Sequence, residues 1–258
     1  MKAAPDAAVA PPRARVACAQ DLERLGDEVI ACELCPRLVA HCREVARVRV
    51  RRHRDDEYWG RPVPAFGDPR ARLLVLGLAP AAHGANRTGR MFTGDSSGDW
   101  LYRALHRAGF ADRPRSASRD DGLVLRGAWV TAAAHCAPPD NCPTPEELGR
   151  CRPFLERELG ALRSLRAVLA LGRIAWDAAL RAQRSRGAEP TERAGFGHGT
   201  ELRWSDGLRM IGSYHPSRQN TQTRRLTEAM LDEAVAQARA VCDGRAQRRL
   251  ARTPVQGA

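Results

Sequence analysis

The sequence contains almost no lysine. Lys2 is the only one among 258 residues, and every other cationic side chain is an arginine. Lysine is the residue that a P-loop uses to hold phosphates and that forms Schiff bases with carbonyl substrates. Its absence from the body of the chain argues against a nucleotide-binding kinase or hydrolase of the P-loop kind. It also argues against lyase chemistry that proceeds through a lysine adduct.

Long apolar runs are missing as well. No stretch approaches the roughly 18 consecutive apolar residues of a membrane span, and residues 1–17 lack the apolar core of a signal peptide. We therefore expect no membrane partner and a cytoplasmic protein. In that reducing compartment, the eight cysteines of the chain indicate metal binding before disulfides.

Acidic residues are outnumbered. The chain has 30 Asp and Glu against 42 Lys and Arg, which gives a net charge of +12 and a pI of about 10.3. Such an excess indicates a polyanionic partner or a solvated basic surface. Composition divides the chain into a disordered tail rich in Ala, Pro and Arg (1–17), one domain (18–242) and a basic C-terminal tail (243–258).

Short apolar runs alternate with helical patterns along the domain. Four of these runs have the length and composition of buried parallel strands: 73–76, 129–134, 167–171 and 210–212. Helical spacing or caps predict helices over 21–30, 97–109, 145–162, 174–181 and 223–242. The alternation predicts a three-layer α/β/α sandwich with a largely parallel sheet. Right-handed crossovers then bring the loops 77–95, 136–141 and 213–217 to one edge of the sheet, where they line a single cleft.

The loop over residues 77–95 carries the densest signal. Its sequence is GLAPAAHGANRTGRMFTGD, and it directly follows the first predicted strand. Glycines let backbone N–H groups approach a ligand closely, Arg87 and Arg90 add positive charge, and Phe92 offers a flat face for stacking. An ordinary strand-to-helix loop is the alternative interpretation.

Four cysteines have the spacing of one metal site. Cys32 and Cys35 form a C-x2-C pair, and Cys136 and Cys151 flank the start of a predicted helix. Four thiolates bind zinc or an iron–sulfur cluster, and ordinary buried thiols are the alternative. Cys142 lies close enough in sequence to compete as a ligand, whereas the remaining cysteines are expected to be structural: Cys18, Cys42 and Cys242.

Several polar residues are candidates for catalysis. His215 directly follows the last strand, a position from which it can donate to a developing anion, and His83 in the glycine-rich loop is second to it. Asp95 leads the candidates for orienting a water molecule, and Asn86 or Asn141 could do so through an amide.

The glycine-rich loop, the four cysteines and the His-Pro-Ser run at 215–217 together resemble the type B (family 5) uracil-DNA glycosylases, over residues 32–242 or so. These are monofunctional iron–sulfur DNA repair enzymes of bacteria and archaea. The resemblance implies a central four-stranded, mainly parallel sheet. It also implies a [4Fe–4S] cluster on Cys32, Cys35, Cys136 and Cys151, with Phe92 stacking on a flipped uracil and residues 214–217 pressing into the minor groove.

The resemblance also implies an activity. The protein would extrude uracil, and other deaminated bases such as hypoxanthine, from single- or double-stranded DNA and hydrolyse the N-glycosidic bond, leaving an abasic site. It would act as a monomer, associated with the nucleoid when bound to DNA. The expected catalytic residues are His215, Asp95 and Asn86, and the expected substrate contacts are Gly77, Ala79, Pro80, Ala81, Ala82, His83, Gly84, Arg87, Phe92, Asn141 and Ser217.

The sequence departs from related glycosylases at several positions. Residues 77–82 contain no polar side chain where related families carry Asp, Asn or Glu, and Thr131 and Ala132 stand where an Asn is often found. Met91 replaces a common Pro. A zinc-binding nucleic-acid adaptor without enzymatic activity is therefore the second hypothesis, and iron content would separate the two.

Overall fold

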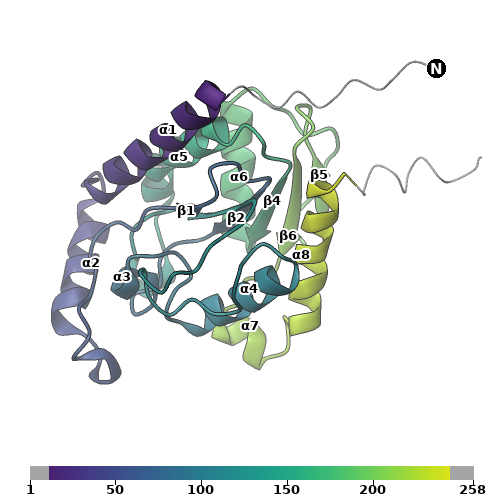
Figure 1. Ribbon diagram of the computed structural model, residues 1–258. Coiled ribbons are helices and arrows are strands. Elements are labelled where there is room, and N and C mark those ends of the chain that lie inside the picture. Colours follow the sequence, from purple (N-terminus) through teal and green to yellow (C-terminus); the bar gives the residue numbers. More distant parts are fainter. Residues whose placement is uncertain (1–11, 245–258) are drawn as a thin grey trace, which may run out of the picture.

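One mixed sheet of six strands forms the centre of the protein, whose computed structural model describes residues 12–244 (Figure 1). The strand order is β1-β3-β2-β4-β6-β5. The strands are β1 (Phe66–Gly67), β2 (Leu73–Gly77), β3 (Ala128–Ala132), β4 (Ala167–Leu171), β5 (Glu201–Arg203) and β6 (Arg209–Ser213). The central four are parallel, and β1 and β5 pair antiparallel at the two edges. The predicted α/β class and parallel core are confirmed. The sheet has six strands and not the four predicted, since the edge strands β1 and β5 are too short to leave a pattern in the sequence.

Helices cover both faces of this sheet. They are α1 (Pro12–Ile30), α2 (Pro36–Val48), α3 (Ala85–Thr88), α4 (Ser96–Arg107), α5 (Pro145–Ala161), α6 (Arg173–Ser185), α7 (Arg218–Gln222) and α8 (Glu228–Cys242), with 3-10 turns η1 (Arg51–His53) and η2 (Pro139–Asn141). Side chains alternate between the faces of a strand. Leu73 and Val75 therefore pack with α4 and α8, whereas Leu74 and Leu76 pack with α5 and α6.

Local signals place most helix starts correctly. Thr144 forms the predicted capping box with Glu147 at the start of α5, and Asp95 caps α4. The single helix expected over 223–242 is wrong at its start: α7 ends before Thr223, Arg224 adopts a left-handed φ of 57°, and Thr227 caps α8. Residues 223–227 therefore connect α7 to α8, and the predicted helix starts five residues late because Thr227 caps it.

The expected tails fall mostly outside the described residues. Helix α1 begins at Pro12, so residues 12–17 belong to a helix and not to the predicted disordered tail. Proline is tolerated in the first turn of a helix, and the alanines and arginines that follow are strong helix formers. The rest of that tail (1–11) and most of the basic tail (245–258) lie outside the described residues.

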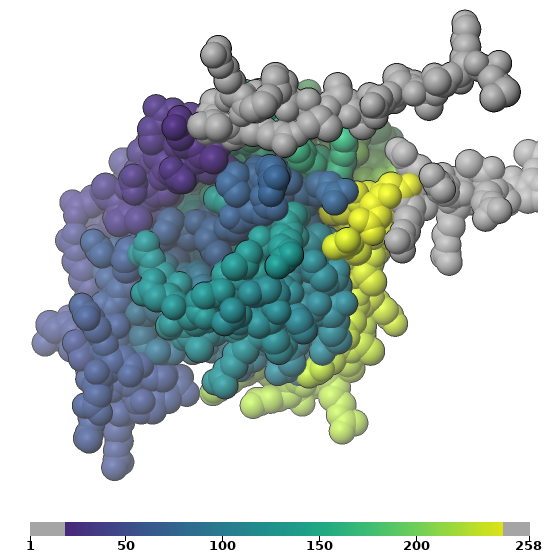
Figure 2. Space-filling model, viewed as in Figure 1, coloured from purple at the N-terminus to yellow at the C-terminus, as the bar shows by residue number. Residues whose placement is uncertain are grey.

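Figure 2 shows one face of the molecule. Helices α1 and α2 and the segment after α2 lie along one side, the stretch from α4 towards β3 covers the centre, and α8 borders the other side. Across the described helices, none combines the length and the apolar character that crossing a membrane requires.

Candidate active site and cysteine cavity

The loops after β2 and β6 meet at the carboxyl edge of the sheet, as the topology predicts. The rings of Phe92 and His215 are stacked, with centroids 6.0 Å apart and an angle of 30° between the planes. Phe92 lies directly against Gly77, where a Cβ atom would come within 2.6 Å of its ring. Phe92 itself adopts a left-handed φ of 53°. Gly77 is therefore needed at the end of β2 to leave room for an aromatic ring.

Several backbone N–H groups of the glycine-rich loop have no partner in the part of the chain that the structure describes. The N–H groups of Gly84 and Asn86 both donate to the carbonyl oxygen of Ala81, at 3.1 Å each, which folds the chain back into α3. Within residues 12–244, the N–H groups of Ala79, Ala81 and Ala82 donate to no protein group. Pro80 has no N–H to offer. This short stretch after β2 thus carries three N–H groups that are available to a ligand.

Asp95 lies at the other end of the same loop. Its Oδ1 accepts a hydrogen bond from the Gly98 N–H at 2.9 Å, which caps α4. Its Oδ2 faces Gly84, where a Cβ atom would come within 2.0 Å of that oxygen. Burial raises the pKa of this carboxyl. One oxygen of Asp95 is therefore structural, and the other stays next to the loop.

His215 is neutral at physiological pH. Burial lowers the pKa of its imidazole to about 4. In the described part of the chain its ring nitrogens have no hydrogen-bond partner, while its backbone carbonyl accepts from the Asn220 amide at 2.8 Å. Ser217 caps α7 through its hydroxyl. The arrangement fixes the backbone of residues 215–217 and leaves an uncharged imidazole free to donate.

Arg87 is held by internal contacts. Its guanidinium donates to the carbonyl oxygens of His83 and Gly94 and to the carboxylate of Asp56, each at 2.9 Å. All three nitrogens therefore have protein partners, and the substrate contact expected of Arg87 stays a prediction. In this structure Arg87 stabilises the shape of the loop through these three hydrogen bonds.

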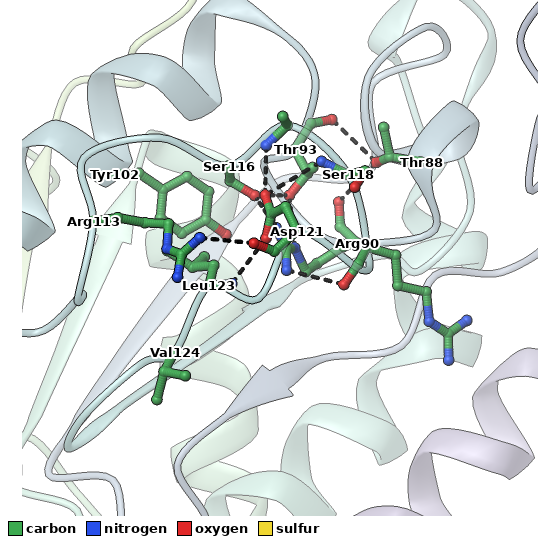
Figure 3. A network of polar contacts seen from close by, with 12 residues as sticks. Thr88, Arg90, Thr93, Tyr102, Arg113, Ser116, Ser118, Asp121, Leu123 and Val124 are labelled. Carbon is green, nitrogen blue, oxygen red and sulfur yellow. Dashed lines mark hydrogen bonds and ion pairs between the residues drawn. The ribbon is translucent and has the colours of Figure 1, made fainter.

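Arg90 is also turned inward, into the network of Figure 3. It is buried and contacts Asp121 at 2.7 Å, the Ser116 hydroxyl at 2.5 Å and the Arg119 carbonyl at 3.1 Å. Burial would raise the pKa of Asp121, but the bond from Arg90 and the N–H groups of Leu123 and Ala117 outweigh it and hold the pKa at about 2. The glycine-rich loop and residues 116–123 are thereby joined as one unit.

The two predicted amide residues lie in different surroundings. Asn86 is fully buried, and its amide donates to the carbonyl oxygens of Cys42 in α2 and Ala82, at 3.3 and 3.4 Å. Asn141 is exposed in η2, at a left-handed φ of 56°. The water-orienting roles expected for these two amides stay predictions.

His83 pairs with a residue that sequence reasoning missed. Its Nδ1 lies 3.1 Å from the Tyr58 hydroxyl, and burial, followed by nearby cations such as Arg52, lowers the pKa of the imidazole. Asp56, the partner of Arg87, comes from the same segment. In the sequence, Tyr58 opens a Tyr-Trp-Gly-Arg-Pro run and Asp56 lies just before it. This run indicates only a loop, so the contacts of these two residues with the glycine-rich loop could not be predicted.

The four predicted cysteines line one cavity. Cys32 and Cys35 lie between α1 and α2, Cys136 follows β3, and Cys151 lies in α5. The backbone N–H of His135 donates to the Cys151 sulfur at 3.4 Å. Cys142 is exposed, does not line the cavity, and donates to the Asp140 carbonyl oxygen at 3.3 Å. The structure therefore does not support competition from Cys142.

Burial controls the electrostatics of the cavity. It raises the pKa of the Cys151 thiol to about 12, and it is also the main cause that raises the pKa of Cys35. Among the described residues, no three His, Cys, Asp or Glu side chains come close enough to hold one metal ion. The structure therefore shows four thiols lining one cavity, and the metal that they would bind stays a prediction.

Comparison with known proteins agrees with this geometry. Residues 64–239 match the family model of the uracil DNA glycosylase superfamily. The chain is 51% identical over 212 residues to the type-5 uracil-DNA glycosylase of Mycobacterium tuberculosis, covering 82% of this chain and 78% of that protein. It is 51% identical over 220 residues to that of Thermus thermophilus (85% and 97%) and 48% identical over 214 residues to that of Pyrobaculum aerophilum (83% and 90%).

Proposed function

The chain belongs to the uracil-DNA glycosylase superfamily and, within it, to the type-5 family, and we propose that it excises uracil from DNA. It hydrolyses the N-glycosidic bond and leaves an abasic site. The observation that supports this most directly is the pair of Phe92 and His215 over Gly77, beside unpaired backbone N–H groups. An aromatic face and neutral donors suit a flat base that leaves as an anion.

The reaction begins with extrusion of the nucleotide, because a base inside a duplex is inaccessible. The flipped base stacks on Phe92. As the glycosidic bond breaks, negative charge grows on the base, and the N–H groups of residues 79–82 and the His215 imidazole donate to it. Donors already fixed in place require no reorganisation at that moment, and one such donor typically contributes a hundredfold or more in rate.

The attacking water needs orientation more than activation, since the sugar is already cationic when water adds. Asp95 is the carboxylate next to the loop, and its Oδ2 faces Gly84 and is free of the capping bond. In this proposal that oxygen accepts a hydrogen bond from the water. The absence of polar side chains in 77–82 fits a site that binds its base mainly through backbone groups, which also accept a base such as hypoxanthine.

The cysteine cavity would hold a [4Fe–4S] cluster through Cys32, Cys35, Cys136 and Cys151. A bound cluster supplies four iron–thiolate bonds that tie together the α1–α2 connection, the segment after β3, and α5. The buried N–H of His135 donates to the Cys151 sulfur, and such a bond stabilises the thiolate form that a metal requires. Iron content with visible absorbance separates this proposal from a zinc-binding adaptor.

Incubation with labelled duplexes tests the activity. The substrates carry uracil or hypoxanthine opposite a defined base, and a matched duplex carries thymine. Strand scission should appear only after alkali treatment, because an abasic site remains and the body of the chain offers no lysine for a lyase step. Iron-loaded protein that releases no base from the uracil duplex would refute the proposal.

A further inference from the structure

An open groove of about 880 Å³ lies beside the glycine-rich loop, and no step above uses it. Its walls come from residues 56–61 on one side and 117–120 on the other, and Arg87 and Thr88 of α3 also line it. We call it the Trp59 groove. Both of its walls are held by the glycine-rich loop: the Arg87 carbonyl oxygen accepts from the Trp59 backbone N–H, and Arg90 donates to the Arg119 carbonyl oxygen.

Trp59 is fixed in the groove by three contacts. Its indole N–H donates to the Pro62 carbonyl oxygen at 3.0 Å, and its backbone N–H donates to the Arg87 carbonyl oxygen at 2.9 Å. The ring lies on Gly89, where a Cβ atom would come within 2.8 Å of it. The indole therefore sits on the loop that holds the base, with Gly89 required for the close approach.

Two exposed arginines stack on this indole. The guanidinium carbons of Arg61 and Arg119 lie 4.1 and 4.6 Å from the ring centroid. Throughout residues 12–244, neither guanidinium forms an ion pair or a hydrogen bond. The main chain of Arg119 is itself held by Arg90, whose guanidinium donates to the Arg119 carbonyl oxygen at 3.1 Å. Both cations are thus positioned by stacking while their N–H edges remain free.

We propose that the Trp59 groove binds backbone phosphates of the DNA strand next to the flipped nucleotide, an inference that rests on the proposed function. A guanidinium stacked on an aromatic ring keeps its fork of N–H donors for bidentate contact with phosphate. Aromatic rings with interleaved arginines are also typical of surfaces that follow a nucleic-acid strand. The arginines of the glycine-rich loop do not serve this purpose, since Arg87 and Arg90 are used internally.

The acidic residues of the groove limit its net charge, and therefore its attraction for DNA. Asp56 is paired with Arg87 at 2.9 Å, while Glu57 and Asp120 remain exposed. These two carboxylates offset the two free guanidinium groups, so the groove exerts little long-range attraction. Its contribution is local: it fixes particular phosphates relative to the Phe92 and His215 pair, and it disfavours a second strand near the carboxylates.

Salt dependence of binding tests the proposal. Arg61→Ala and Arg119→Ala should each lower the slope of log affinity against log salt by about 0.9 on duplex DNA, one phosphate contact per residue. The loss should be equal on uracil-containing and undamaged duplexes. Arg126→Ala is the matched control, because Arg126 is exposed just before β3 begins, at the opposite edge of the sheet. Slopes indistinguishable from that control would overturn the proposal and leave a protein ligand as the occupant to seek.

Neutral methylphosphonate linkages locate the contact. Placed one at a time around the uracil, they should weaken binding of the unaltered protein at one or two positions. At the position that Arg119 contacts, the linkage should have no further effect on Arg119→Ala, because the interacting partner is already gone. Additive losses at every position would overturn the proposal. Binding to undamaged DNA is measured without excision, so failure of the groove and failure of the glycosylase proposal give different results.

Discussion

The cysteine cavity and the glycine-rich loop are built in opposite ways. The cavity gathers Cys32, Cys35, Cys136 and Cys151 from three separate parts of the chain. The loop is one continuous stretch, in which Arg87 donates to the loop's own Gly94 carbonyl oxygen and Arg90 bonds to Asp121 outside it. We therefore expect the cavity to depend on a bound cluster, whereas the loop is held by protein contacts.

Burial has a related electrostatic effect in both places. It raises the pKa of Cys151 to about 12 and lowers the pKa of His215 to about 4, so both groups are neutral before anything binds. We expect the cavity thiols to become charged only when they bind metal. In the proposed reaction the His215 imidazole stays neutral, and it donates to an anion only when negative charge develops on the departing base. Substitutions in the two regions should therefore fail differently, one in folding and the other in chemistry.

The largest effect is expected for Cys151→Ala. Removing one of four ligands from a site that joins three segments should abolish iron binding and soluble folding together. Iron analysis and absorbance near about 400 nm on anaerobically prepared protein would measure the loss. Cys142→Ala is the matched control, since that thiol is exposed and outside the cavity, and it should keep both. A Cys151→Ala protein that folds without iron would show that the cavity, like the loop, keeps its structure without a bound cluster.

Arg90→Met should have the next largest effect. The Arg90 and Asp121 pair is buried, with side-chain exposures of 6% and 15%, and removal of one partner leaves an uncompensated charge. Such a loss typically costs about 3–5 kcal/mol. Urea denaturation would measure it, with Arg47→Ala as the control, because its ion pair with Glu44 is solvent-exposed and worth about 1 kcal/mol or less. Equal effects of the two variants would mean that the loop does not depend on the network of Figure 3.

How well the sequence predicted each region follows from these differences. The parallel strands and the shared cleft edge followed from periodicity and crossover rules, and the structure also brings together the four predicted cysteines, because buried thiols at metal spacing have few other uses. The roles of Arg87, Asn86 and Asn141 could not be predicted in the same way. Polar loop residues serve either a ligand or their own backbone, and only the fold shows that Asp56 and the Cys42 carbonyl lie within reach.

His215→Ala should slow excision about a hundredfold or more at saturating protein while leaving DNA affinity nearly unchanged. The imidazole bond strengthens as charge develops on the base, so its loss falls on the chemical step. Single-turnover rates paired with binding titrations would measure both quantities. A defect recovered by raising the protein concentration would instead make His215 a DNA anchor.

The pH dependence of stability provides a second test of His215. Its pKa is about 4 in the folded protein against an ordinary 6.5, so the unfolded chain binds a proton that the folded site excludes. Stability should therefore be fully retained above about pH 6.5 and decline between pH 6.5 and 4. Denaturation midpoints should fall less steeply over that interval in His215→Gln. An unchanged pH dependence in that variant would show that the imidazole is not buried as described.

Arg87→Ala should have the smallest effect on DNA binding and separates the two arginine classes. The side chain of Arg87 is only 13% exposed and makes three contacts within the protein, so its loss should cost about 1.5 kcal/mol of stability and slow excision by loosening the loop. The slope of log affinity against log salt should stay the same, because no phosphate contact is removed. Arg61→Ala, one short segment away, should give the reverse pattern of full stability and a reduced slope. If Arg87→Ala lowered the slope and left stability intact, this arginine would act on DNA as its position in the motif suggests, and the loop would bind charge through its own side chains after all.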